Sequence, residues 1–169
     1  MQGSYKLPIK IKLTSAFLGD IRTPKGKKLN IKQVGDELHW VLKDSQWRWA
    51  MKEAIDSMGL QLVTSTDFVR LPTSIRAPKV YQYQRVFHES ASRKQELMEC
   101  FREGTVMSFD IFVLGSLEEQ SNGKGNITIP LRPPTKEEVM GLFSLIGSHI
   151  GLSPWGSKFG YGRFSIVTE

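Results

Sequence analysis

The segment from residue 135 to residue 167 constrains the fold more than any other part of the sequence. Thr135 and Glu138 form a capping-box pattern, in which each side chain accepts a hydrogen bond from the backbone N–H of the other residue. Apolar residues then recur at helical spacing as far as Gly151: Val139, Leu142, Phe143, Ile146 and Ile150. A loop over 152–161 leads into a closing strand over 163–167. The pattern predicts a capped helix with one buried face, followed by a loop and a strand that joins a sheet.

Other stretches show the periodicity of strands and helices. Leu7, Ile9 and Ile11 alternate with polar residues, which is typical of a half-buried strand. The expected elements are strands over 6–17, 80–88 and 106–114 (the last buried on both faces), helices over 45–58 and 92–102, a basic loop over 19–28, and a hairpin joining 29–33 to 37–42 around Gly35–Asp36. The stretch 61–69 is ambiguous between strand and irregular chain.

Without its insertions, this order of elements is β-α-β-β-α-β, the ferredoxin-like (RRM-like) arrangement of the α+β class. We expect one domain over 1–169, an antiparallel sheet with two main helices on one face, and a β-hairpin-like insertion after the first strand. The other face of such a sheet can bind a ligand. No apolar run approaches the ~20 residues that cross a bilayer. The sequence therefore predicts a cytoplasmic protein with no membrane partner.

The positive charge is concentrated near the N-terminus. The chain carries +6, and residues 1–32 alone carry +7, with eight Lys and Arg residues against Asp20. Such asymmetry favours a polyanionic partner, although a solvated strand and loop kept soluble by lysines is an equal alternative. Cys100 is the only cysteine and cannot form an internal disulfide. Its neighbours Met98 and Phe101 favour a small core residue over a reactive thiol.

The loop over 151–164 interleaves glycines, cations and aromatic side chains. Its glycines allow positive φ and close approach to a ligand, and N–H groups in such turns bind phosphate. Unpaired bases stack on aromatic rings for ~1–3 kcal/mol each. The dinucleotide fingerprint does not apply, because its glycines lie between a strand and a following helix. The residues expected to contact nucleic acid are Trp155, Lys158, Phe159, Gly160, Tyr161, Gly162 and Arg163, with Lys25, Lys27 and Lys28. The alternative is a tight structural loop whose aromatic residues enter the core.

The stretch 157–164, with Phe-Gly-Tyr-Gly-Arg-Phe as its specific part, resembles the glycine-rich loop of the RAMP superfamily. These are CRISPR-associated RNA-binding proteins built on ferredoxin-like domains. The segment 14–20 is loosely similar to the N-terminal segment of the same superfamily. The resemblance implies that the loop contacts guide RNA and that other protein subunits are partners in a ribonucleoprotein. The chain departs from the pattern in being short, since many members carry two ferredoxin-like halves, and in its insertion after the first strand.

Some members of that superfamily cleave repeat RNA without metal, through side chains such as histidine. His88 and His149 are therefore weak catalytic candidates. His149 lies within one turn of the apolar Ile146, where a structural role outweighs a catalytic one. No set of His, Cys, Asp and Glu has metal-ligand spacing, and no cofactor motif occurs, so neither a metal nor a cofactor is expected.

The sequence is compatible with three functions. The leading one is a non-catalytic subunit that binds single-stranded nucleic acid, with guide RNA preferred to single-stranded DNA. The second is a small metal-independent endoribonuclease that processes repeat RNA. The third is a structural protein-interaction subunit, of phage or mobile-element origin, whose glycine-rich loop packs against a protein partner. The placement of charge and the composition of the loop favour the first.

Overall fold

A computed structural model of the chain describes residues 3–19, 21–24, 26–77, 82–87, 95–116, 131–151 and 162–167. A four-stranded antiparallel sheet has the order β12-β1-β11-β7. Its strands are β1 (Tyr5–Leu13), β7 (Val69–Arg70), β11 (Val106–Val113) and β12 (Phe164–Ile166). Helix α1 (Asp44–Ser57) comes between β1 and β7 in the chain, and α2 (Lys136–Leu145) between β11 and β12. The α+β class expected from the sequence is confirmed.

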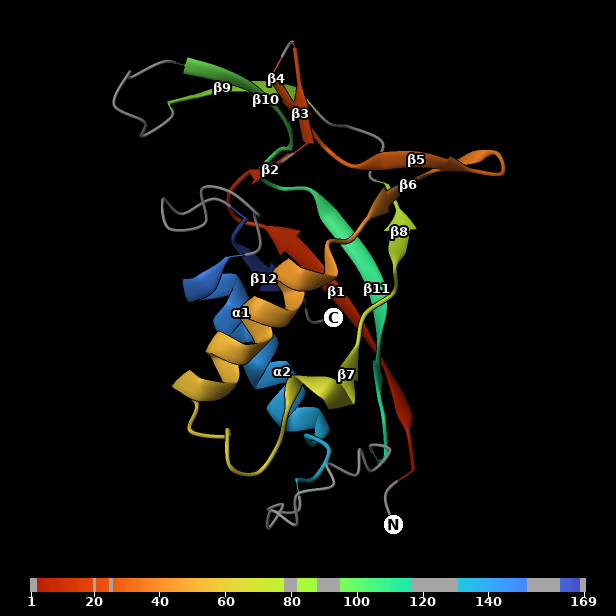
Figure 1. Ribbon diagram of the computed structural model, residues 1–169, viewed down its shortest axis with the longest axis vertical. Coiled ribbons are helices and arrows are strands. Elements are labelled where there is room, and N and C mark those ends of the chain that lie inside the picture. The colour runs from red at the N-terminus through yellow and green to blue at the C-terminus, as the bar shows by residue number, and fades with distance from the viewer. Residues whose placement is uncertain are drawn as a thin grey trace, which may run out of the picture.

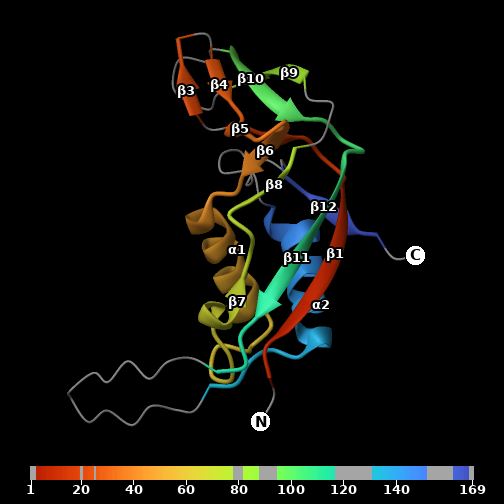
Figure 2. The same cartoon turned by 90° about the vertical axis from the view of Figure 1, so that its right-hand side faces the viewer.

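The two central strands bury one face and expose the other. In β1, Ile9, Ile11 and Leu13 are buried while the lysines between them are exposed. In β11 the buried and exposed positions also alternate, so the expectation that both faces of this strand are buried is wrong. In Figure 1, α1 and α2 lie on one side of β1 and β11, and Figure 2 turns the other side toward the viewer.

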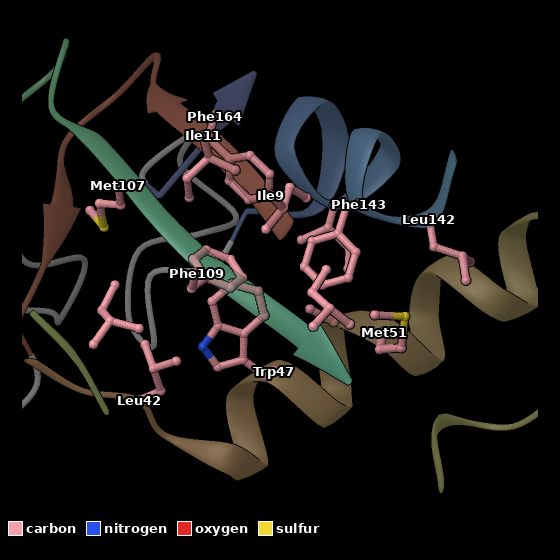
Figure 3. Packing of buried hydrophobic residues seen from close by; sticks show 14 of the residues in the cluster. Ile9, Ile11, Leu42, Trp47, Met51, Met107, Phe109, Leu142, Phe143 and Phe164 are labelled. Atoms are coloured by element: carbon pink, nitrogen blue, oxygen red, sulfur yellow. The ribbon is translucent and has the colours of Figure 1, made fainter. Parts of the chain in front are cut away.

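The core lies between the sheet and the two helices, and Figure 3 shows its packing. Trp47 of α1 stands edge-on to Phe109 of β11, with ring centroids 5.7 Å apart, and lies 5.9 Å from Phe143 of α2. All three rings are buried. Aromatic pairs in such geometry contribute beyond the area that they bury. They hold both helices against one face of the sheet, and none of the described helices covers the opposite face.

The predicted capped helix is present. The Thr135 hydroxyl accepts a hydrogen bond from the Glu138 backbone N–H at 3.1 Å, and the Glu138 carboxylate accepts one from the Thr135 N–H at 2.9 Å. After α2 the chain continues as a π-helical turn, η2 (Ile146–Ile150), which ends at Gly151 with φ +81°. A Cβ at Gly147 would lie 2.3 Å from the backbone oxygen of Phe164. Glycine at this position therefore lets η2 contact β12 directly.

Two further sheets lie beyond one end of the four-stranded sheet, in the upper part of Figure 1. One contains β2 (Phe17–Leu18), β3 (Ile21–Thr23), β4 (Gly26–Lys28), β9 (Gln82–Phe87) and β10 (Gln95–Phe101), and the other β5 (Ile31–Val34), β6 (Glu37–Val41) and β8 (Ser74–Arg76). The buried Trp40 ring joins them, since its centroid lies 4.7 Å from that of Phe17 and 5.2 Å from that of Phe101. The predicted hairpin around Gly35–Asp36 is confirmed.

Several predicted elements differ from the structure. The expected helix over 92–102 is wrong, because 95–101 form β10, which pairs with β9 on one side and with β2 and β4 on the other. These long-range ladders outweigh the helical spacing of the apolar residues. The expected basic loop over 19–28 contains the short strands β3 and β4. The ambiguous stretch 61–69 is a run of turns and a 3₁₀ turn, η1 (Thr66–Phe68), with β7 following it.

Candidate nucleic-acid interface

The uncovered side of the four-stranded sheet, here called the open face, carries basic, polar and aromatic side chains. Its members are Lys6, Pro8, Lys10 and Lys12 of β1, Arg70 of β7, Val106, Ser108, Asp110 and Phe112 of β11, and Ser165 of β12. Strand register sets them in rows across the sheet. Lys6 lies opposite Phe112, Lys10 opposite Ser108, and Lys12 between Val106 and Ser165. The alternation of β1 thus places three lysines on one surface.

The charge of the open face is positive. Its four cations and one carboxylate sum to +3. Lys6 Nζ lies 3.8 Å from Asp110 Oδ2, and both side chains are about half exposed, so this pair is weak. In the described part of the chain, no carboxylate pairs with Lys10, Lys12 or Arg70. Lys10 and Lys12 are exposed and available to an anionic ligand, whereas Arg70 is half-buried, with its Nη1 buried and without a hydrogen-bond partner among the described residues.

A groove lies in the middle of the open face. It has a volume of about 500 Å³ and is lined by Pro8, Ile9, Lys10, Ser108, Phe109, Asp110 and Val167. The Lys10 ammonium and the Ser108 hydroxyl are the groups here that can donate hydrogen bonds to phosphate. Along the strands, Lys6 and Arg70 lie on one side of the groove and Lys12 on the other. The arrangement suits an elongated polyanion better than a compact one.

The structure joins the two segments that resemble the RAMP superfamily. The Gly162 N–H donates to the Ala16 carbonyl at 2.8 Å, and the Arg163 N–H donates to the Ser15 hydroxyl at 2.9 Å. The Thr14 N–H in turn donates to the Arg163 carbonyl at 2.9 Å. Gly162 has φ +76°, a left-handed conformation that favours glycine. These bonds fix the base of the glycine-rich loop against the end of β1.

Arg163 also reaches the end of the last helix. Its Nη1 donates to the Ser148 carbonyl on η2, where a cation satisfies a free carbonyl and interacts favourably with the helix dipole. Its Nε is buried and has no hydrogen-bond partner among the described residues. Part of the guanidinium predicted to contact phosphate is therefore engaged within the protein.

The other predicted contact residues fall into two groups. Lys27 and Lys28 lie on β4, in a hairpin with β3, and Lys28 is exposed. The hairpin is anchored at Glu99, whose carboxylate is buried and accepts the Leu29 N–H at 3.0 Å. The predicted residues Lys25, Trp155, Lys158, Phe159, Gly160 and Tyr161 lie outside the described residues. Lys6, Lys10 and Lys12 were not among the predicted contact residues, although their alternation along the first strand indicates a common face.

Two candidate reactive side chains, those of His149 and Cys100, lie in the described part of the chain. His149 is exposed and its Nδ1 lies 2.6 Å from the Ser148 hydroxyl, while His88 lies outside the described residues. Burial raises the pKa of the Cys100 thiol to about 11, with the neighbouring Glu99 carboxylate adding to the effect. Within the described ranges, no group of three or more His, Cys, Asp and Glu residues is arranged to hold a metal ion. Nor does any helix in them have the length and apolarity to span a membrane.

Comparison with known proteins gives a likeness in fold alone. No family profile matches the chain, and no curated protein matches it in sequence. Twenty-four chains of solved structures are similar to it. One belongs to a cryo-electron microscopy structure of the Type III-B Cmr-beta bound to cognate target RNA, with a TM-score of 0.59 and 11% sequence identity. The match covers 98% of this chain and 60% of that chain, so this protein spans about three-fifths of its neighbour's length.

Proposed function

We propose that this protein is a non-catalytic subunit of a CRISPR-type ribonucleoprotein and that it binds single-stranded RNA, the guide strand in the first instance. It would act as one RAMP-like domain with a ferredoxin-like core, from which the sheets of β2–β6 and β8–β10 project as insertions. Single-stranded DNA is the second ligand to consider.

The observation that carries this proposal is the open face. Three lysines of β1 share one surface with Arg70, and the described helices α1 and α2 pack on the other side of the sheet. Phosphate contacts from Lys and Arg supply most of the affinity of nucleic-acid binding that does not depend on sequence. The fold of the Cmr-beta chain supports the proposal, because that complex is bound to target RNA.

The glycine-rich loop is the second part of the proposed interface. Its base is held at Ser15, Ala16 and Ser148, close to the end of β1 where Lys12 lies. We assign RNA contacts to its predicted residues, with Arg163 acting mainly to position the loop. Lys27 and Lys28 of the β3–β4 hairpin would add further phosphate contacts.

The experiment is a salt titration of RNA affinity. Fluorescence anisotropy of a labelled single-stranded RNA is measured with the wild type, Lys10→Gln/Lys12→Gln, and a control, Lys52→Gln/Lys136→Gln. The control lysines are exposed on α1 and α2, on the helical side. Each lost phosphate contact should reduce the slope of log K against log[salt] by about 0.7, so the first pair should reduce it by about 1.4. Equal losses in both variants would contradict the assignment to the open face.

A second experiment tests the proposal that the protein is non-catalytic. Labelled repeat RNA incubated with the protein in EDTA should stay intact. Metal-independent cleavage that tracks with the protein through purification would favour the endoribonuclease instead, and His149→Ala would then show whether that side chain takes part.

A further inference from the structure

We propose that Phe112 is a base-stacking position on the open face, and that Lys6 and Arg70 flank it to hold the phosphates of the same strand. This inference rests on the proposed function and assigns a second kind of contact to the same surface. The ligand is an unpaired nucleotide of any base, since stacking uses the face of the ring and not its edge.

The register of three strands makes the arrangement. Phe112 of β11 lies directly opposite Lys6 of β1 on one side and directly opposite Arg70 of β7 on the other. The three residues therefore form one row across the sheet, in which the aromatic residue lies between the two cations. Adjacent strands lie about 4.8 Å apart, so the two cations start from backbone positions about 10 Å apart with the ring between them.

The ring is accessible. Phe112 is 44% exposed, whereas the alternate residues of β11, among them Phe109 and Ile111, are buried in the core. A single exposed Phe is ordinary on a protein surface. This one differs because its cross-strand neighbours on both sides are cations and because the groove of the open face begins one row away, at Pro8 and Asp110.

Charge decides between the possible occupants. An apolar protein partner would have to cover Lys6 and Arg70 along with the ring, and burying cations without a counter-charge is costly. A single-stranded nucleic acid offers a flat base to the ring and phosphates to the cations within one nucleotide unit. Asp110 is the one acidic group of the open face and already lies beside Lys6. The row therefore fits nucleic acid better than an apolar surface.

The test compares Phe112→Ala with a control on the same strand. Val106→Ala is that control, because Val106 is 45% exposed on the same face of β11, opposite Lys12. Phe112→Tyr keeps the ring. Affinity is measured by anisotropy on a single-stranded RNA. Stacking is followed directly with an oligonucleotide carrying 2-aminopurine, whose fluorescence falls when the base stacks. Circular dichroism and urea unfolding check that each variant is folded.

Phe112→Ala should weaken binding about 5- to 150-fold, the equivalent of about 1–3 kcal/mol per stacked base, and should leave the salt slope unchanged. The same variant should lose part of the 2-aminopurine quenching, whereas Phe112→Tyr and Val106→Ala should behave like the wild type. If Phe112→Ala binds like Val106→Ala while Lys10→Gln/Lys12→Gln binds weakly, the stacking inference is overturned and the proposed function stands. If none of these variants changes affinity, both are overturned.

Discussion

Replacing Gly147 by alanine is expected to destabilise the protein, although alanine is the better helix former. A Cβ at this position would lie 2.3 Å from the Phe164 backbone oxygen and 2.7–2.8 Å from two carbons of its ring. Phe164 is buried and paired with Leu13 of β1, so it cannot move without disturbing the edge of the sheet. Such overpacking costs about 1–3 kcal/mol. Over most of this range the cost exceeds the ~1 kcal/mol by which alanine is favoured over glycine in a helix.

Gly141, in α2, provides the matched control. A Cβ there would meet only the end of the Met58 side chain, at 3.2 Å from Cε, and Met58 is 41% exposed and can move aside. Gly141→Ala should therefore be neutral or stabilising by up to ~1 kcal/mol. Because the gain in helix propensity is common to both variants, urea unfolding followed by circular dichroism should separate them by the overpacking cost, about 1–3 kcal/mol. Equal midpoints for Gly141→Ala and Gly147→Ala would refute the packing argument.

Three further predictions concern titratable groups. The bidentate Arg132 pair and the Thr135 N–H lower the pKa of Glu138 to about 2 from 4.5. Because the folded-state pKa is lowered, this stability is present above pH ~4.5 and is lost as the pH falls toward 2. Glu138→Gln should thus cost about 1 kcal/mol at pH 7, and its urea midpoint should vary less than that of the wild type across this window. Cys100 should resist maleimide in the native protein and react once urea unfolds it, as mass spectrometry can show; rapid native labelling would count against its burial. His149→Ala should change the free energy of unfolding by no more than about 0.5 kcal/mol, because the side chain is exposed; a larger loss in urea unfolding would mean that the Ser148 contact matters.

The elements that could be predicted from the sequence are those specified by nearby residues. The capping box at Thr135, the helical stripe that follows it and the hairpin at Gly35–Asp36 all depend on contacts a few positions apart. Strand β10 could not be predicted in this way, because its partners lie in β2, β4 and β9. Its apolar residues at 97, 98 and 101 match helical spacing, and only distant backbone groups decide the outcome.

One part of the candidate site could likewise be predicted from the sequence, and another part could not. The three lysines of β1 lie on one face because a strand alternates, which the sequence shows directly. That Phe112 lies between Lys6 and Arg70 depends on two registers, one of them between residues more than a hundred positions apart. No local pattern contains this information. The two superfamily-like segments were likewise recognised separately, and their hydrogen bonds at Ser15 and Ala16 emerge only in the folded chain.

The position of β1 at the centre of its sheet has a consequence for the order of folding. Its paired residues in β11 are 94–108 positions away, and Leu13 pairs with Phe164, 151 positions away. During synthesis α1 and the β5–β6 hairpin can form from local contacts, whereas the partner strands that the structure describes for β1 emerge only with 106–113 on one edge and 164–166 on the other. An unpaired apolar strand is an aggregation hazard, and charged residues along it are the usual protection. Lys6, Lys10 and Lys12 are therefore expected to reduce aggregation of the nascent chain, over the same residues that later form the open face.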